Sequence, residues 1–174
     1  SRILDINLGA ILRSSQIFGR HMLGQGGGSI INVGSISGLG PLSRVFTYSA
    51  SKAGVEALGN SLRGELAHHG ARVGVAYFSW IDTEMVRGAD RHPALGQMRA
   101  KLPGPVGKTY PLSDVGDAVV AGFESRARWI GVPRHLVRLA TALRGLLPRL
   151  TERGASNFPE MEARFEADVA ERGV

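Results

Sequence analysis

Cysteine is absent from this sequence of 174 residues. Its absence excludes disulfide bonds and thiolate metal sites, and it fits a reducing compartment. A run of roughly 18 apolar residues is also missing, so no segment is expected to span a membrane, and no secretory signal is recognisable. We therefore expect a cytoplasmic protein, with membrane association as an alternative. Because the chain begins at Ser1 in the middle of a helical pattern, we also expect it to be a fragment.

Positive charge is concentrated in one part of the chain. The formal net charge is +6, and residues 126–153 carry all of it, with seven arginines and one acidic residue. No nucleic-acid partner is expected, since interleaved surface aromatics and a known binding motif are missing. No metal site is expected either, because none of the histidines has ligand spacing with another histidine or with carboxylates. The histidines are His21, His68, His69, His92 and His135.

Hydrophobic periodicity predicts that helices and strands alternate along the chain. The residues between 79 and 112 are expected to form a polar loop. The alternation is typical of a parallel sheet covered by helices on both faces, but three strands are too few to close such a core. We therefore predict an α/β, Rossmann-like, doubly wound parallel sheet whose N-terminal strands are missing from this chain. The expected helices are 3–23, 47–69 and 113–125, and the expected strands are 29–33, 72–78 and 129–132.

Tyr48 and Lys52 are four residues apart on one predicted helix, so their side chains lie on the same face about one turn apart. A neighbouring ammonium group and the positive end of a helix both favour the phenolate form of a tyrosine, which suits general acid–base catalysis. By itself this spacing is most often an exposed pair on a surface helix. Ser35 favours a functional interpretation, because it stands 13 residues before Tyr48 at the exit of a predicted buried strand. Parallel sheets place their sites beyond the carboxyl ends of strands.

Two segments, residues 31–38 and 48–55, resemble the active-site strand and helix of the short-chain dehydrogenases/reductases. Residues 5–9 resemble the family's helix that bears the catalytic asparagine, and residues 80–83 resemble the loop that contacts the nicotinamide carboxamide. The resemblance covers residues 3–132 with the segments in the family's order and spacing.

The resemblance implies an NAD(P)-dependent oxidoreductase that interconverts a carbonyl and a secondary alcohol by hydride transfer. Tyr48 would give or take the proton of the reacting oxygen, Ser35 would orient that oxygen, and Lys52 would favour the phenolate and bind the nicotinamide ribose. Asn7 would hold a water molecule that links Lys52 to solvent. The implied catalytic residues are thus Asn7, Ser35, Tyr48 and Lys52. The implied cofactor contacts are Tyr48, Lys52, Phe78, Ser79, Ile81 and Thr83.

The sequence departs from the family pattern in two places. Phe78 and Ser79 stand where the family usually has Pro-Gly, so the loop backbone is expected to differ and Phe78 to shape the pocket. The glycine-rich dinucleotide loop is absent, and so is the residue that selects the cofactor, which is expected to be NAD or NADP without a choice between them. Large side chains after the second strand favour an apolar substrate, although core packing explains Trp80 and Met85 equally well. These side chains are Trp80, Met85, Leu95, Met98 and Leu102.

Residues 1–133 are predicted to form the C-terminal part of the catalytic domain, and residues 134–174 a basic amphipathic helical extension with a last helix over 158–174. Leucines from position 135 to 150 recur at helical spacing between arginines. This segment could lie on an anionic membrane, cap the domain or close over the substrate pocket. The leucines of the expected stripe are Leu136, Leu139, Leu143, Leu147 and Leu150.

Small residues form a stripe on the Tyr48 helix. They could pack on the core of this chain or, as helices of this family commonly do, on a second subunit, so we expect a homo-oligomer, either a dimer or a tetramer. The rival hypothesis is a truncated, non-catalytic module that dimerises or associates with a membrane through its basic C-terminal helix. The small residues are Ala50, Gly54, Ala57 and Ser61.

Overall fold

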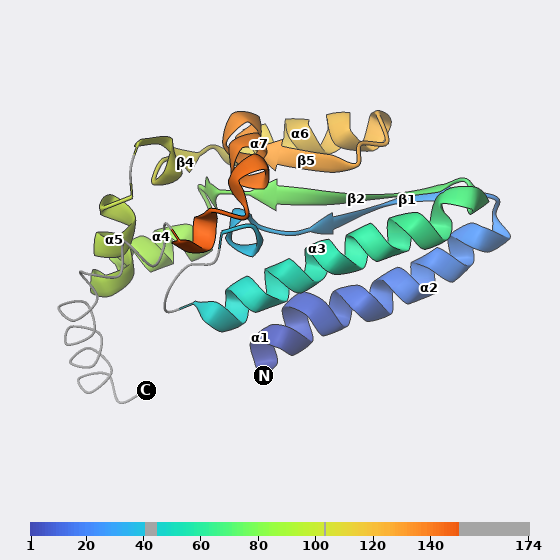
Figure 1. Cartoon of the computed structure of the whole chain (residues 1–174), viewed down its shortest axis with the longest axis horizontal. Coiled ribbons are helices and arrows are strands. Elements are labelled where there is room, and N and C mark those ends of the chain that lie inside the picture. The colour runs from blue at the N-terminus through green and yellow to red at the C-terminus, as the bar shows by residue number, and fades with distance from the viewer. Residues whose placement is uncertain (41–44, 103, 150–174) are drawn as a thin grey trace.

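The computed structural model describes residues 1–40, 45–102 and 104–149 (Figure 1). Its central sheet has three parallel strands in the order β1, β2, β5, with Asn32 opposite Val75 and Tyr77 opposite Gly131. A separate parallel pair, β3 and β4, lies beyond the end of β2. The parallel α/β sheet predicted from the alternation is confirmed. The strands are β1 (Gly28–Val33), β2 (Ala71–Phe78), β3 (Trp80–Ile81), β4 (Thr109–Tyr110) and β5 (Trp129–Val132).

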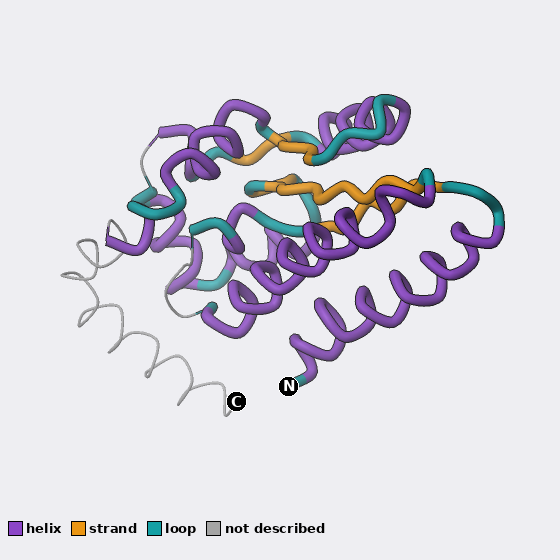
Figure 2. The backbone as a smooth tube through the Cα atoms, turned by 45° about the vertical axis from the view of Figure 1, so that its right-hand side comes forward, coloured by secondary structure: helices purple, strands orange, loops and turns teal. Residues whose placement is uncertain are grey.

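Helices cover both faces of the sheet (Figures 1 and 2). The N-terminal helical segment and the long helix α3 lie along one face, while α6 and α7 pack against β5 on the other. A π-helical turn, Asp5–Gly9, interrupts the first segment, and α3 continues as a 3-10 turn that ends at Gly70 in the left-handed conformation (φ 75°). The helices are α1 (Arg2–Leu4), α2 (Ala10–Gly24), α3 (Phe46–Leu66), α4 (Glu84–Arg91), α5 (Pro93–Ala100), α6 (Leu112–Glu124) and α7 (Arg134–Leu143).

The central strand β2 is buried on both faces, as expected for an apolar strand between two neighbours in a parallel sheet. Val75 is 1% exposed, and Gly59 of α3 lies so close to it that a Cβ at this glycine would overlap the Val75 side chain. Arg63 of α3 donates a hydrogen bond from Nε to the Val73 carbonyl oxygen at 2.7 Å. Gly59, which has no side chain, and Arg63, which donates the hydrogen bond, thus determine how closely α3 packs on the sheet.

The free side of β1 borders a hollow of about 270 Å³ beneath α2. Ile11, Ser15 and Ile31 are among the residues that line it, and within the described ranges β1 is hydrogen-bonded to β2 alone. An unpaired edge on a half-buried strand is the feature expected where further strands of a doubly wound sheet would add.

Two secondary-structure predictions are wrong. The segment from 79 to 112 is not a loop, because it contains β3, α4, α5 and β4. The start signals were present: Thr83 accepts a hydrogen bond from the Val86 amide as the N-cap of α4, and Pro93 occupies the first turn of α5. Dense charge in α4 and the shortness of both helices obscured their periodicity.

The helix expected over 135–150 ends at Leu143 as α7. The expected leucine stripe is also wrong in part, because Leu139 is 56% exposed whereas Val137 and Ala140 face the core. Leu150 and the helix predicted over 158–174 lie outside the described residues. Within the described ranges, no helix combines the length and the apolar character needed to cross a bilayer.

Candidate active site

Ser35 lies two residues beyond the end of β1 and caps the 3-10 turn Ile36–Gly38. Its hydroxyl oxygen accepts hydrogen bonds from the Ser37 amide (3.3 Å) and the Ser37 hydroxyl (3.0 Å), and it makes a long donor contact of 3.5 Å to the Phe78 carbonyl oxygen. Ser35 is buried, at 8% exposure. The side chain is therefore fixed at the carboxyl ends of both β1 and β2, the edge at which parallel sheets carry their sites.

Tyr48 and Lys52 lie one turn apart near the start of α3, as predicted. The Lys52 ammonium donates a hydrogen bond to the Val33 carbonyl oxygen at 3.1 Å and lies 5.7 Å from the centre of the Tyr48 ring. Burial lowers the pKa of Lys52, because a desolvated ammonium loses the hydration that stabilises its charge. The cation is thus held between the end of β1 and the phenol.

Gly38 brings the Ser35 turn directly onto α3. A Cβ at this glycine would lie 2.8 Å from the Lys52 carbonyl carbon and 3.0 Å from its oxygen, which leaves no room for a side chain. The turn that begins at Ser35 therefore packs on the part of α3 that carries Tyr48 and Lys52. Three of the four predicted catalytic residues thus lie on two segments that contact each other near the end of β1.

Asn7, the fourth, contacts α3 beside Lys52 rather than Lys52 itself. Its amide nitrogen donates to the Ser51 hydroxyl oxygen at 3.2 Å, and Ser51 donates in turn to the Tyr48 carbonyl oxygen at 2.7 Å. Ser51 is completely buried. Sequence reasoning missed Ser51 as the residue that joins Asn7 to α3, and its signal was a small hydroxyl residue three positions after Tyr48.

The residues predicted to contact the cofactor after β2 have different environments. Ile81 is 7% exposed and packs with Tyr110 and Val132, so its side chain belongs to the core. The Ser79 amide donates to the Val132 carbonyl oxygen at 2.9 Å, but its hydroxyl oxygen is buried and has no hydrogen-bond partner among residues 1–40, 45–102 and 104–149. Phe78 packs against the same core cluster as Ile81. The Ser79 hydroxyl is thus left with an unmet hydrogen bond within the described part of the chain.

Thr83 has a structural role in the segment that follows. Its hydroxyl donates to the Ile81 carbonyl oxygen (3.3 Å) and accepts from the Val86 amide (3.4 Å), so it holds the start of α4 against β3. Of the side chains predicted to face an apolar substrate, Met85 is 73% exposed. The other four are half-buried: Trp80, Leu95, Met98 and Leu102.

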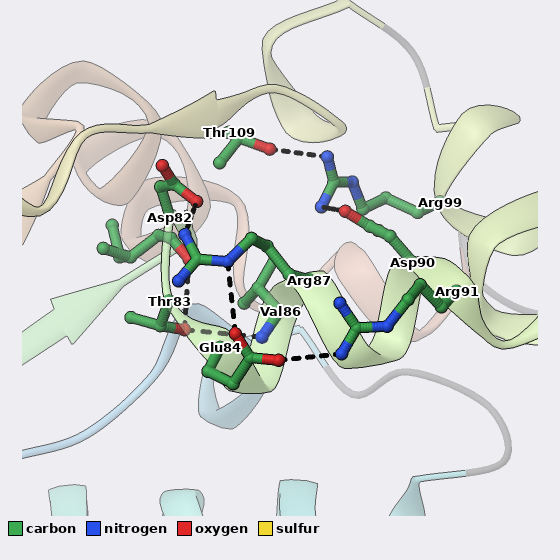
Figure 3. Close-up of polar contacts among 10 residues, drawn as sticks. Asp82, Thr83, Glu84, Val86, Arg87, Asp90, Arg91, Arg99 and Thr109 are labelled. Atoms are coloured by element: carbon green, nitrogen blue, oxygen red, sulfur yellow. Dashed lines mark hydrogen bonds and ion pairs between the residues drawn. The ribbon is translucent and has the colours of Figure 1, made fainter.

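Ion pairs hold α4 and α5 in place (Figure 3). Arg87 pairs with Asp82 at 2.5 Å, and Glu84 pairs with Arg91 at 2.8 Å. Hydrogen bonds from Arg91 and then Arg87 lower the pKa of the exposed Glu84 carboxyl. We name this part of the chain, residues 82–109, the charged segment.

Arg99 is the least exposed cation of the charged segment, with 16% of its side chain exposed. It pairs with Asp90 of α4 at 2.8 Å and donates to the Thr109 hydroxyl (Figure 3). It also lies over the Trp80 ring, 5.3 Å from the ring centre. One side chain of α5 therefore contacts α4, β4 and β3.

Comparison with known proteins gives the family. The family model described as short chain dehydrogenase matches residues 1–94, which is more than half of the chain and includes β1, α3 and β2. The chain belongs to the short-chain dehydrogenase family. The resemblance drawn from the motifs around Ser35 and Tyr48 is thereby confirmed.

Individual relatives agree with this assignment. The chain is 41% identical over 88 residues to a galactitol 2-dehydrogenase of Rhizobium johnstonii, covering 49% of this chain and 34% of that protein. It is similar to a solved short-chain dehydrogenase from Sphingobium yanoikuyae in complex with NADPH, with a TM-score of 0.64 and 26% identity, covering 84% of this chain and 53% of that one. It is also similar to a bulky-bulky ketone specific alcohol dehydrogenase from Comamonas testosteroni, with a TM-score of 0.59 and 25% identity, covering 82% and 51%.

The chain is shorter than the members of the short-chain dehydrogenase family that it matches. It spans about a third of the length of the galactitol dehydrogenase and a little over half of the solved chain from Sphingobium yanoikuyae.

Proposed function

We propose that this chain supplies the proton-transfer residues of a nicotinamide-dependent oxidoreductase that interconverts a carbonyl and a secondary alcohol. One observation carries the proposal. The half-buried Lys52 ammonium is held between the Val33 carbonyl oxygen and the Tyr48 ring, and the turn that begins with Ser35 packs on its backbone. A cation, a phenol and a fixed hydroxyl at the end of a parallel strand are the groups needed to move one proton at a carbonyl oxygen.

Each residue has a separate role in the proposed reaction. During reduction Tyr48 donates its hydroxyl proton to the carbonyl oxygen, and during oxidation it removes the proton from the alcohol. Ser35 donates a hydrogen bond that orients the reacting oxygen, and the positive charge of Lys52 stabilises the phenolate left on Tyr48. Asn7 holds the water through which Lys52 exchanges protons with solvent, and its bond to Ser51 fixes its amide for that purpose.

The residues of the chain fit a nicotinamide ribose and carboxamide. Lys52 would hydrogen-bond the ribose, and the buried Ser79 hydroxyl has an unmet hydrogen bond that the carboxamide could satisfy. Ile81 and Thr83 would contribute backbone groups, since their side chains are used within the protein. The nicotinamide supplies or accepts the hydride. The relative from Sphingobium yanoikuyae is complexed with NADPH, and the proposed cofactor of this chain is NAD or NADP.

An apolar substrate is favoured by the half-buried side chains of the charged segment and its edge, among them Trp80, Met98 and Leu102. The ketone-specific relative supports a carbonyl substrate of this kind. The galactitol dehydrogenase, whose name describes a polyol, shows that related sites also accept polar alcohols. The reacting group, rather than the rest of the substrate, is thus the firmest part of the proposal.

A homo-oligomer is supported by the outer faces of α2 and α3. Ile6, Ile17 and Phe18 of the first helical segment are each more than half exposed. On α3, Gly54 packs against Leu8, whereas the other small residues of the stripe are exposed: Ala50, Ala57 and Ser61. An apolar face beside a face of small side chains suits the close approach of helices from a second subunit.

The alternative, a non-catalytic module that binds a membrane, has one observation in its favour. Leu139 and Leu146 are exposed among the arginines of residues 134–149. Against it, Leu136, Val137 and Ala140 of α7 are buried, so most of the apolar face of this helix is already used within the protein. This packing favours capping of the domain over insertion of α7 into a bilayer. The boundary predicted at residue 133 stays a prediction.

The test is hydride transfer by the intact protein with reduced and oxidised forms of both nicotinamide cofactors, against a panel of apolar and polar ketones and secondary alcohols. Ser35→Ala should lower kcat/KM by about 10²-fold or more, as expected when a donor to the reacting oxygen is removed. Ser37→Ala is the matched control: it removes a neighbouring hydroxyl that donates a hydrogen bond to the Ser35 hydroxyl oxygen, and it should cost a few-fold at most. Full turnover in Ser35→Ala, or no dinucleotide binding by the intact protein, would contradict the proposal.

A further inference from the structure

A buried carboxylate lies on α3 one turn beyond Lys52. Glu56 is 7% exposed, and both of its oxygens contact the Arg144 guanidinium, at 3.0 Å and 3.3 Å. The two residues are 88 positions apart, and Arg144 follows directly after the end of α7. A bidentate pair of this kind has a fixed geometry, because the guanidinium fork matches the two carboxylate oxygens.

Tyr77 of β2 completes this cluster. Burial, and then the nearby charge of Glu56, raise the pKa of Tyr77 well above its ordinary value. The phenol beside this carboxylate therefore remains neutral. Glu56 thus joins three parts of the chain: the helix that carries Tyr48 and Lys52, the strand that leads to Phe78, and the residues after α7.

The residues after α7 also lie on the loop that begins with Ser35. Leu147 packs so closely that a Cβ at Gly40 would lie 3.0 Å from its Cδ1 atom. The same leucine contacts the core cluster that contains Leu39 and Tyr77. We name residues 144–147 the strap. At its start the strap makes the ion pair with Glu56, and at its end Leu147 packs on Gly40 and on the core cluster.

We propose that Arg144 is a positioning residue: through its ion pair with Glu56 it holds the strap against residues 36–40 and so closes the site on the side of Ser35. The structural part of this inference stands on the contacts alone, and its effect on turnover rests on the proposed function. The strap and its contacts would then determine how firmly substrate is held, while Tyr48 and Lys52 determine the chemistry.

Arg144 and Glu56 differ in their exposure to solvent, and this difference allows the strap to detach. The Arg144 side chain is 54% exposed, so water can solvate it when it leaves, whereas Glu56 stays buried and loses its countercharge. α7 itself is anchored separately by Leu136, Val137 and Ala140. Loss of the ion pair should therefore loosen the strap and residues 36–40 without unfolding α7 or α3.

The experiment compares Arg144→Gln, Arg144→Lys and the matched control Arg149→Gln in the intact protein, by hydrogen exchange and by steady-state kinetics. Arg149 is an exposed arginine five positions further along. In Arg144→Gln, amide exchange in the strap and in residues 36–40 should speed up about tenfold, while exchange in α3 stays unchanged. A tenfold change is the size expected when an interaction between two contacting residues is lost. KM for the carbonyl substrate should rise about five- to tenfold, while kcat and the Kd of the cofactor change less than about twofold. Arg144→Lys should restore part of the protection, and Arg149→Gln should match the wild type.

The double variant Glu56→Gln, Arg144→Gln separates the ion pair from other effects of the arginine. Its exchange rates should be no faster than those of Arg144→Gln, because the second change removes a charge that is already unpaired. Unchanged exchange in Arg144→Gln, or equal effects of Arg149→Gln, would overturn the proposal. If Arg144→Gln exchanges faster but the wild type shows no catalytic activity, the proposal for the strap stands and the proposed function is refuted.

Discussion

The end of β1 and the charged segment are built in different ways. At the end of β1, Ser35, Lys52 and Gly38 are fixed by buried contacts and by hydrogen bonds to backbone carbonyl groups. In the charged segment, α4 and α5 are held largely by ion pairs on the surface (Figure 3). Buried packing tolerates little displacement, whereas exposed ion pairs each contribute little and are screened by salt. The groups proposed to move a proton are thus rigid, whereas the charged segment can change its conformation at a small cost in free energy.

The largest effect is expected when the close contact between the Ser35 turn and α3 is broken. Gly38→Ala places a methyl group 2.8 Å from the Lys52 carbonyl carbon, and this backbone cannot move without displacing the catalytic helix. We expect the free energy of unfolding to fall by about 1–3 kcal/mol, the usual cost of overpacking, and kcat to fall at least tenfold. Denaturant titration and steady-state kinetics measure the two effects.

Gly64→Ala is the control for this substitution. Gly64 lies on the same helix, and a Cβ there meets no atom within 4 Å. The variant should gain about 0.5–1 kcal/mol from the better helix propensity of alanine, with unchanged activity. If Gly38→Ala behaved in the same way, the contact between the turn and α3 would not be rigid.

A smaller effect is expected in the charged segment. Arg99→Gln removes the contacts to Asp90, Thr109 and the Trp80 ring, and it should cost about 1 kcal/mol, because this side chain is mostly shielded from solvent. Arg91→Gln breaks only an exposed pair with Glu84 and should have no measurable effect on stability. Hydrogen exchange of α5 should distinguish the two variants. In a separate measurement on the wild type, 1 M salt should speed hydrogen exchange in α4 more than in α3. Equal sensitivity of α4 and α3 to salt would remove the contrast between the two regions.

The smallest effect concerns the charge on Lys52. Burial lowers the pKa of Lys52 in the folded protein below its usual 10.5, so between these two values the unfolded chain binds a proton that the folded chain does not. The free energy of unfolding contributed by Lys52 therefore rises with pH in that window, and the full cost of burying the ammonium is present below it. Lys52→Met should be slightly more stable than the wild type at pH 7, and the margin should shrink as the pH approaches 10.5. Lys101→Met, at an exposed position, provides the comparison, and a margin that grew with pH would contradict the assigned direction.

The site around Tyr48 could be predicted because its parts are local. The sequence predicts a buried apolar strand that leads to Ser35, and Tyr48 and Lys52 stand only four positions apart at helical spacing. The pattern and the family resemblance therefore agree. The bond from Asn7 to Ser51 and the ion pair from Glu56 to Arg144 were not predictable, since they join segments 44 and 88 positions apart whose docking depends on the fold.

The charged segment was mispredicted for another reason. In α4 the stabilising groups are charged side chains that interact along the helix surface, so no apolar stripe marks it. Thr83 and Pro93 were readable signals of the two helix starts, but they were outweighed by the polar composition. Helices built from exposed charges are recognised by their caps rather than by their hydrophobic period.

The central claim is that Tyr48 moves the proton at the reacting oxygen. The measurement that tests it most directly compares Tyr48→Phe with the wild type in the intact protein, by dinucleotide binding and by single-turnover hydride transfer. The control is Tyr110→Phe, which loses a hydroxyl bonded only to the Pro105 carbonyl oxygen in the described structure. We predict that Tyr48→Phe binds the cofactor within a few-fold of the wild type but transfers hydride about 10²–10⁴-fold more slowly, the range expected for loss of a general acid. Hydride transfer by Tyr48→Phe at the wild-type rate would contradict the account.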